Sequence, residues 1–284
     1  MYISDETLEK FIKEDIPYID LTSCILDIAG QKGKIRFFCR EEAVICGTEE
    51  VIRIFGKLGV APVNWLRSGT KVKPNTVLIE GEGAAEQLHM AWKVSLNILE
   101  YASGIATRTS RFLEHARAAN PDIQVVTTRK GFPGTKELSI KAVVSGGGFP
   151  HRLGLSESAL IFPQHLTFIG GMDRMLENMR EIKIKACENK VVVEVENMED
   201  AIKACKAGAD GVQFDKIKSE KLHEAVILLK EIRENILVLA AGGINISNVE
   251  AYAKTGIDAI VTSSVYYGKP VDIGTVMENA GPEA

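Results

Sequence analysis

The sequence has no apolar run close to the roughly 18 to 20 residues that a transmembrane helix needs. Its N-terminal stretch, MYISDETLEKFIKEDIPYID, is acidic and amphipathic, and it lacks the basic start and apolar segment of a secretory signal peptide. Low-complexity segments and short internal repeats are missing as well. These absences argue against a helical membrane protein and a repeat protein. We expect a cytoplasmic protein that does not bind membranes.

The sequence also has few cysteines and no excess of positive charge. The five cysteines (24, 39, 46, 187, 205) are widely spaced, with no CxxC pair and no zinc pattern with histidine, so we expect reduced and mostly buried thiols. A net charge of −4 and a pI near 5.9 argue against nucleic-acid binding, which usually needs an extended basic face. With 284 residues and 45% hydrophobic content, one large or two modest globular domains are expected.

The pattern of the sequence changes near residue 120. Before it, helices and strands mix: Ser4–Asp15 and Ala84–Thr109 have helical periodicity, whereas Lys34–Cys46 and Lys73–Glu80 are typical of strands. After it, short apolar strands alternate with amphipathic helices. The expected strands are 123–128, 159–163, 190–195, 211–215, 236–241 and 258–263, and the expected helices are 173–187, 198–208, 219–235 and 246–256. This alternation predicts parallel strands with right-handed crossovers, and hence an α/β barrel or part of one.

Polar residues follow several of these strands, at the barrel end where chemistry usually takes place. Gly242, Gly243 and Asn245 follow one strand, and Ser263 and Ser264 end the next. A glycine turn beside small hydroxyl residues can offer backbone N–H groups to a phosphate. A tight turn capped by Asn or Ser is the alternative, and the two interpretations are about equally supported by so short a motif.

A positive segment interrupts this acidic chain. From Arg129 to Arg152 there are five Lys/Arg residues and one acidic residue, a local charge of +4 that leaves −8 on the rest. At least one of Lys136 and Lys141 is expected to lie on an ordinary solvated helix face. Arg129 and Lys130 after a strand, with His151 and Arg152 after a triple glycine, are better explained as a pocket for a carboxylate or a phosphate.

Two carboxylates complete the candidate site. Glu194 lies in an apolar strand and Asp215 ends another. Glu194 and Glu196 face the same side of their strand, which is either solvent or the barrel interior, where an unpaired carboxylate is costly. Carboxylates beside a phosphate predict a divalent cation such as Mg²⁺. They can also stabilise an oxocarbenium-like sugar centre.

At these residues the chain resembles the quinolinate phosphoribosyltransferase (nicotinate-nucleotide pyrophosphorylase) family. The similar motifs are SGIAT (103–107), TRK-x-x-PG (128–134), GGG-x-x-HR-x-GL (146–155), VEVEN (193–197), Asp215 of GVQFD, AGGIN (241–245) and TGIDAIVTSS (255–264). They span about 160 residues in order, and together they are highly specific.

The resemblance implies the α/β fold of a type II phosphoribosyltransferase. An N-terminal α/β sandwich domain (1–106, joined by 266–284) would precede an open α/β barrel (107–265). It also implies phosphoribosyl pyrophosphate (PRPP) and Mg²⁺ as partners, a small aromatic acceptor whose ring nitrogen attacks the ribose, and a homodimer with shared active sites, with a hexamer left open.

The resemblance further implies a role for each matching residue. Arg129, Lys130, His151 and Arg152 match the pocket for the acceptor's anionic groups, and Lys93 would reach in from the neighbouring subunit. Glu194 and Asp215 match the carboxylates near ribose and metal, and together with Lys130 they are the expected catalytic residues. The 5′-phosphate would be held by Gly242, Gly243, Asn245, Ser263 and Ser264.

Two positions depart from the family pattern. Phe162, in IFPQH, replaces the pocket lysine, and Gly131 replaces a threonine. Quinolinate carries two carboxylates, so the loss of a cation should weaken its binding. TRKGFPGTK, GGGFPHRLGLSE and IFPQH are most similar to the ModD pyrophosphorylase branch, and a less charged acceptor lying against Phe162 would fit. The alternatives are the carboxylating enzyme of NAD synthesis and a non-catalytic sensor of a phosphorylated ligand.

Overall fold

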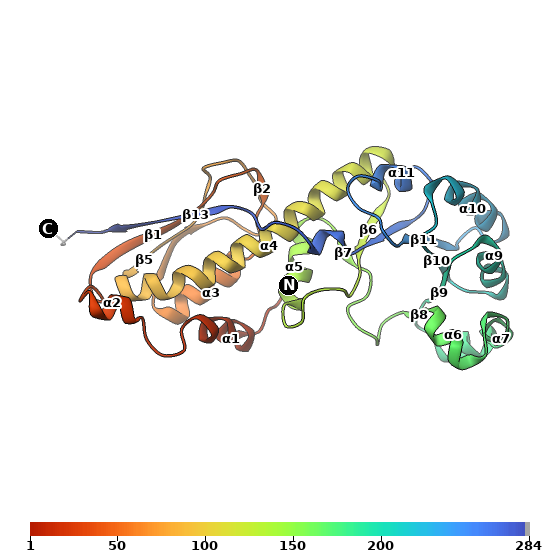
Figure 1. Cartoon of the computed structure of the whole chain (residues 1–284), viewed down its shortest axis with the longest axis horizontal. Coiled ribbons are helices and arrows are strands. Elements are labelled where there is room, and N and C mark those ends of the chain that lie inside the picture. Colours follow the sequence, from red (N-terminus) through yellow and green to blue (C-terminus); the bar gives the residue numbers. More distant parts are fainter. Residues whose placement is uncertain (282–284) are drawn as a thin grey trace. The chain divides into compact units, whose positions relative to one another are not determined.

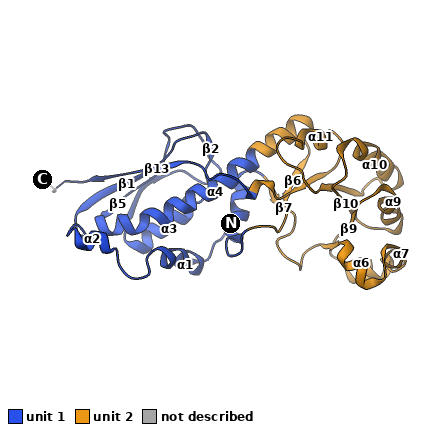
Figure 2. Ribbon diagram, in the orientation of Figure 1, with its two compact units in different colours: residues 1–110, 132–147, 266–284 blue, residues 111–131, 148–265 orange. Residues whose placement is uncertain are grey.

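The computed structural model describes residues 1–281, which form two compact units (Figure 2). Unit 1 comprises residues 1–110, 132–147 and the C-terminal stretch from Tyr266, and unit 2 comprises residues 111–131 and 148–265. Residues 282–284, which belong to the predicted C-terminal addition to the first domain, lie outside the described residues.

Unit 1 is built on an antiparallel sheet. Its strand order is β13 (Ile273–Asn279), β1 (Lys32–Cys39), β5 (Val77–Ala84) and β3 (Ala61–Trp65). A separate two-stranded ladder pairs β2 (Ala43–Val44) with β4 (Lys71–Val72). In β1, alternate residues are buried, which is the pattern of a strand with one face on the core.

Unit 1 contains the helices α1 (Asp5–Asp15), α2 (Leu21–Ile25), α3 (Thr48–Leu58) and α5 (Lys136–Ser145), and most of α4 (Ala85–Ala119) (Figure 1). All of them except α2 contribute side chains to the buried cluster of this sheet. Ile54 and Phe55 from α3 and Leu88 from α4 share one buried cluster with Phe37 from β1 and Ile79 from β5. The cluster joins helices to a sheet in an α/β sandwich, which is the architecture that the family resemblance implies for this part of the chain.

Unit 2 contains a sheet of seven parallel strands. They are β6 (Gln124–Thr127), β7 (Phe149–Pro150), β8 (Ala159–Ile161), β9 (Val191–Val195), β10 (Gly211–Asp215), β11 (Leu237–Ala241) and β12 (Ala259–Thr262). The spatial order is β7-β6-β12-β11-β10-β9-β8. Strands that follow one another along the chain are therefore neighbours throughout, except for β7 and β8, which form the two edges. This is the predicted parallel α/β sheet of an open barrel.

The crossovers of unit 2 carry mostly short helices. They are α6 (Pro163–Ile169), α7 (Met172–Glu177), α8 (Met179–Lys185), α9 (Met198–Ala207), α10 (Ser219–Ile232) and α11 (Val249–Ala253), and the 3₁₀ turn η1 (Ser264–Tyr266) follows the last strand of this sheet. One side of the sheet is filled by a small apolar cluster that includes Leu160, Val192, Leu239 and Val261. No helix in the part of the chain that the structure describes is long and apolar enough to cross a membrane.

Several predicted boundaries are wrong, each for a local reason. The helix predicted to end at Thr109 continues to Ala119, because Phe112, Leu113 and Ala116 extend its buried face. The strand predicted from Lys73 begins at Val77, after a turn in which Asn75 has φ +67°.

The strand predicted to end at Cys46 ends at Cys39, and the helix predicted over 173–187 divides at Asn178 into α7 and α8. The helix predicted over 246–256 spans only Val249–Ala253.

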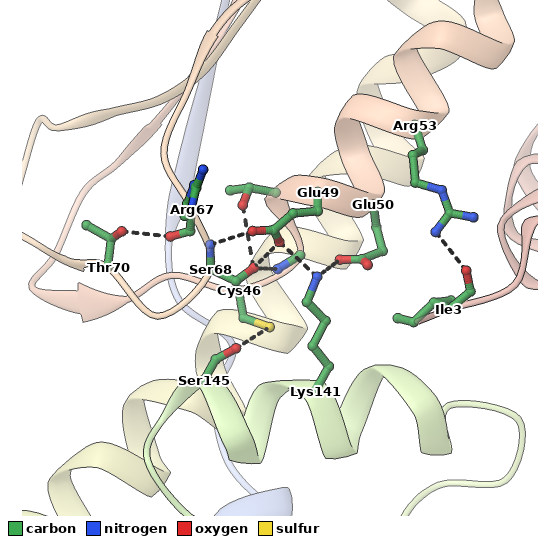
Figure 3. Close-up of polar contacts among 12 residues, drawn as sticks. Ile3, Cys46, Glu49, Glu50, Arg53, Arg67, Ser68, Thr70, Lys141 and Ser145 are labelled. Atoms are coloured by element: carbon green, nitrogen blue, oxygen red, sulfur yellow. Dashed lines mark hydrogen bonds and ion pairs between the residues drawn. The ribbon is translucent and has the colours of Figure 1, made fainter. Parts of the chain in front are cut away.

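Of the two lysines for which a solvated helix face is expected in at least one case, Lys141 is buried in an ion pair. Its ammonium lies 2.8 Å from Glu49 Oε2 and 2.5 Å from Glu50 Oε2, and the lysine and Glu50 side chains are only 9% and 3% exposed (Figure 3). Burial alone would lower the pKa of Lys141, but the hydrogen bonds to both glutamates raise it. Lys141 therefore holds α5 against α3 within unit 1, whereas Lys136 on the same helix is exposed.

Candidate active site

The carboxyl ends of the seven parallel strands lie along one edge of the unit 2 sheet. In spatial order, the residues predicted from the sequence at this edge are His151 and Arg152 (after β7), Arg129 and Lys130 (after β6), Ser263 and Ser264 (after β12), Gly242, Gly243 and Asn245 (after β11), Asp215 (on β10), Glu194 (on β9) and Phe162 (after β8). The sheet thus places cations at one side, carboxylates at the other and the glycine turn between them. Lys93 lies on α4 in unit 1, with its Nζ 4.2 Å from the centre of the Trp92 ring.

Arg152 is a buried cation, with 7% of its surface exposed. Among the described residues its guanidinium makes one long hydrogen bond, 3.4 Å from Nη1 to the Ser158 carbonyl oxygen. Burial and the neighbouring charge of Arg129 lower its pKa, against a smaller opposing effect from the charge of Glu157. A buried guanidinium with so few hydrogen bonds is suited to binding an anion, and that role stays a prediction.

His151 lies beside this cation on the same short segment. Its backbone N–H donates to the Thr127 carbonyl at 2.9 Å, which fixes the segment to the end of β6. Burial, and then the charge of Arg152, lower the pKa of His151 below its usual 6.5. A lowered pKa favours the neutral imidazole, which is suited to hydrogen bonding rather than to serving as another cation.

Glu194 is half-buried and held by a neighbour on the next strand. Glu194 and Gln213 are register partners on β9 and β10, and Gln213 Nε2 donates to Glu194 Oε2 at 2.7 Å. Burial raises the pKa of Glu194, and the nearby charge of Asp215 raises it further against the opposing hydrogen bond from Gln213. The two carboxylates thus act on each other within one site.

Asp215, at the end of β10, is the second member of the carboxylate pair. Its Oδ2 lies 2.9 Å from the ammonium of Lys216. The backbone of Gly242 on the adjoining turn comes so close that a Cβ there would lie 2.7 Å from the Lys216 nitrogen, and closer still to Asp215 Oδ1. Gly242 also has φ +85°. Only glycine fits this close approach of two strand ends.

The turn after β11 is held by its own side chains. Asn245 Oδ1 accepts from the Ser247 N–H at 2.9 Å, and its Nδ2 donates to the Gly243 carbonyl at 3.2 Å. Thr262 Oγ1 lies 2.9 Å from Ser264 Oγ and also donates to the Ile244 carbonyl at 2.9 Å. Asn245 thus makes the capping contacts expected of a tight turn. A phosphate held here would rely chiefly on backbone N–H groups, and that role stays a prediction.

Phe162 follows one edge strand of the sheet and contacts a side chain that follows the other edge strand. The Arg152 guanidinium carbon, after β7, lies 5.7 Å from the centre of the Phe162 ring, after β8. The ring also stacks on His165 at 5.8 Å between centres, and His165 Nδ1 accepts from the Phe162 N–H at 2.9 Å. The carboxyl-end edge therefore curls round, and an aromatic face sits beside the buried cation.

The carboxylates suit a hard divalent cation held jointly with a substrate. Among the residues that the structure describes, no three His, Cys, Asp or Glu side chains gather as a metal cage. Mg²⁺ commonly binds through one or two carboxylates plus substrate phosphates, and Glu194 with Asp215 offers that partial set.

Two residues of this edge, Gln213 and Lys216, do not emerge from the sequence analysis. Gln213 lies inside an apolar strand, and only the register with β9 reveals that it holds Glu194. Lys216 has no distinguishing neighbour in sequence apart from Asp215, and its φ of +57° is visible only in the structure.

Comparison with known proteins identifies the family to which this chain belongs. The sequence profile of the quinolinate phosphoribosyl transferase C-terminal domain matches residues 105–276, and that of the N-terminal domain matches residues 20–103. This chain belongs to the quinolinate phosphoribosyltransferase family. As a member of that family it is a pentosyltransferase enzyme.

Individual relatives cover nearly the whole chain. A protein of Pasteurella multocida, provisionally named pyrophosphorylase ModD, is 34% identical over 98% of this chain and 99% of its own length. The protein of the same provisional name from Rhodobacter capsulatus is 36% identical over 90% and 98%. The crystal structure of nicotinate-nucleotide pyrophosphorylase from Ehrlichia chaffeensis superposes with a TM-score of 0.89, at 25% identity over 98% and 100%. The resemblance to this family and the predicted fold class are confirmed.

Proposed function

We propose that the enzyme transfers the ribose 5-phosphate of PRPP to a ring nitrogen of a small aromatic acid-like acceptor and releases pyrophosphate, as a ModD-type pyrophosphorylase. The observation that carries the proposal is the buried and poorly compensated guanidinium of Arg152, at an edge that also presents a carboxylate pair. The guanidinium suits an acidic acceptor, and the carboxylates suit the positive charge that develops on ribose.

Each side of the edge has a part in this reaction. Arg129 and Arg152 hold the anionic group of the acceptor, with the neutral imidazole of His151 as a hydrogen-bonding partner. Glu194, oriented by Gln213, stabilises the oxocarbenium-like C1 of ribose as the bond to pyrophosphate breaks. Lys130 supplies a positive charge to the reacting centre from the side of the edge opposite Glu194. The backbone of Gly242 and Gly243, with Ser263, holds the 5′-phosphate.

Mg²⁺ is the expected metal, held by Glu194 and Asp215 together with phosphate oxygens of PRPP. When bound, the metal neutralises charge on the phosphates. A homodimer is part of the proposal, with Lys93 reaching the site of the neighbouring subunit. We also keep the expectation that the enzyme is cytoplasmic.

Phe162 sets the class of acceptor. Its ring lies beside Arg152 and is partly buried against the apolar cluster of unit 2, in the position where the family pattern has a lysine. An aromatic ring can stack there, but a second carboxylate would face an apolar surface and stay unpaired. The acceptor is therefore an aromatic heterocycle with fewer carboxylates than quinolinate.

One other reaction remains as a rival. The carboxylating nicotinate-nucleotide pyrophosphorylase reaction is favoured by the 0.89 TM-score to the Ehrlichia chaffeensis enzyme of that name. It would yield nicotinate mononucleotide and carbon dioxide from quinolinate. The non-catalytic sensor considered from the sequence is set aside, because the chain belongs to a family of pentosyltransferases. Substituting Glu194→Gln should abolish turnover if this carboxylate has its proposed role.

The deciding experiment measures pyrophosphate release from PRPP and Mg²⁺ with a panel of acceptors: quinolinate, nicotinate and other nitrogen heterocycles. Release with a singly charged heterocycle but not with quinolinate supports the proposal. Release with quinolinate, accompanied by carbon dioxide, supports the carboxylating reaction. The Phe162→Lys variant sharpens the test, because it should improve kcat/KM for quinolinate relative to the wild type. Phe162→Leu, which adds no charge, is the matched control.

A further inference from the structure

Lys216 has a backbone conformation that a lysine rarely adopts. Its φ is +57°, in the left-handed region that favours glycine. The Lys216 N–H donates to the Ala241 carbonyl at 2.9 Å, and Gly242 packs against the Lys216 backbone with no room for a Cβ. The neighbouring strand thus holds Lys216 in a strained conformation, and such strain is concentrated at functional sites.

This conformation places the lysine ammonium on the carboxylate side of the edge. Nζ lies 2.9 Å from Asp215 Oδ2, and the carboxylates of Glu194 and Glu196 act on it electrostatically. The Lys216 side chain is 77% exposed. An ion pair so open to water is weak, so the ammonium can exchange Asp215 for another anion at little cost.

The charge distribution of the edge indicates what that other anion is. PRPP has a phosphate at one end and a pyrophosphate at the other. The glycine turn after β11 and the hydroxyls after β12 suit the 5′-phosphate. The carboxylates of Glu194 and Asp215 would repel a pyrophosphate beside them wherever a bound Mg²⁺ does not offset their charge. A cation that already pairs with Asp215 can offset this repulsion, and Lys216 is placed to do so.

We propose that Lys216 is a further substrate-binding residue of this enzyme, whose ammonium leaves Asp215 and binds the pyrophosphate group of PRPP. The exchange also frees the Asp215 oxygen as the substrate arrives. The inference rests on the proposed phosphoribosyl transfer, and it concerns this chain's own lysine rather than the metal.

The test is calorimetric binding of pyrophosphate and of ribose 5-phosphate, each with Mg²⁺, to the full-length protein. Lys216→Met removes the charge and keeps the length and the backbone requirement of the side chain. We expect it to weaken pyrophosphate binding about tenfold and to leave ribose 5-phosphate binding within about twofold of wild type. Lys216→Arg should restore most of the affinity. Lys221→Met, an exposed lysine on the following helix α10, is the charge-matched control and should change neither affinity.

Three results would overturn the inference: unchanged pyrophosphate binding in Lys216→Met, a loss confined to ribose 5-phosphate, or an equal loss of both ligands that Lys221→Met reproduces. If the wild-type protein binds PRPP, but Lys216→Met binds pyrophosphate as tightly as wild type, the proposed function stands and Lys216 has no part in it. A wild-type protein that binds neither PRPP nor pyrophosphate would remove the proposed function, and the inference with it.

Discussion

Gly242 and Gly243 share one turn and have similar backbone angles, with φ +85° and +75°, but their surroundings differ. A Cβ on Gly243 would meet nothing within 4 Å, whereas a Cβ on Gly242 would overlap Asp215 and the Lys216 backbone. The pair therefore separates the cost of a left-handed backbone from the cost of steric overlap.

We predict that Gly243→Ala lowers the free energy of unfolding by about 1 to 2 kcal/mol, the cost of a left-handed backbone alone. Gly242→Ala should cost at least about 2 kcal/mol more, because the ends of β10 and β11 must move apart. Urea unfolding of both variants measures the difference. Equal losses would show that the turn relaxes freely, and that the close approach of Gly242 to Asp215 is not required.

The site residues that could be predicted from sequence are those that follow strands. Arg129, Asp215 and Gly242 each end an apolar segment, so the parallel alternation alone places them at one edge. Gln213 and Lys216 could not be found in that way. The partner of Gln213 is set by strand register, and the strain at Lys216 is set by the glycine of the next turn.

At the scale of single elements, α5 is fixed by an ion pair that its sequence gives no reason to expect. Lys136 and Lys141 are five positions apart on the same helix, and no sequence pattern tells which of them is solvated. The difference comes from Glu49 and Glu50, at the start of α3, which lie against α5 (Figure 3).

We predict that Lys141→Met lowers the free energy of unfolding by about 3 to 5 kcal/mol, because the Glu50 carboxylate is left buried and uncompensated. The double variant Lys141→Met with Glu50→Gln should recover a large part of this loss. Lys136→Met, on the exposed part of the same helix, should stay within about 0.5 kcal/mol of wild type. Chemical denaturation measures all three. A single variant as stable as wild type would contradict a fixing role for Lys141.

The same contact predicts a dependence of stability on pH. Burial alone would raise the pKa of Glu49, but hydrogen bonds from Lys141 and Ser68 outweigh it and lower the pKa from 4.5 to about 2. Since the folded-state pKa is depressed, the stabilisation is fully present above pH 4.5 and is lost as the pH falls toward 2. The Glu49 side chain is 40% exposed, so screening by solvent limits the effect to about 1 kcal/mol.

Denaturation of wild type and Glu49→Gln between pH 6 and pH 2.5 tests this. The two proteins should converge in stability as the pH falls, because the glutamine has no charge to lose. Curves that stay parallel over this range would mean that Glu49 has an ordinary pKa in the folded protein.

At the scale of the whole molecule, the class of fold is predictable from sequence and the grouping of its segments is not. Strand and helix alternation indicates a parallel sheet, and the structure has one of seven strands. Residues 132–147, which connect β6 to β7 and include α5, nevertheless group with unit 1. A crossover helix would ordinarily be assigned to the sheet it connects. Contacts between residues about ninety positions apart, as between Lys141 and Glu49, decide otherwise.

The proposed sharing of active sites between two subunits gives a test that involves the whole assembly. If Lys93 of one subunit completes the site of the other, Lys93→Ala and Glu194→Gln should each lose most activity as homodimers. In a heterodimer of the two variants, the intact Glu194 belongs to the Lys93→Ala chain, and the intact Lys93 comes from its partner. One of the two sites is then complete, whereas the other carries both defects.

We therefore predict that the heterodimer, purified through two different affinity tags, has about half of the wild-type activity per dimer. Pyrophosphate release measures it, and mixing the purified homodimers without exchange is the control. A heterodimer as inactive as its parents would mean that Lys93 serves the site of its own chain. A fully active Lys93→Ala homodimer would remove Lys93 from the site, because its ammonium, now over the Trp92 ring, would then have no part in binding either substrate.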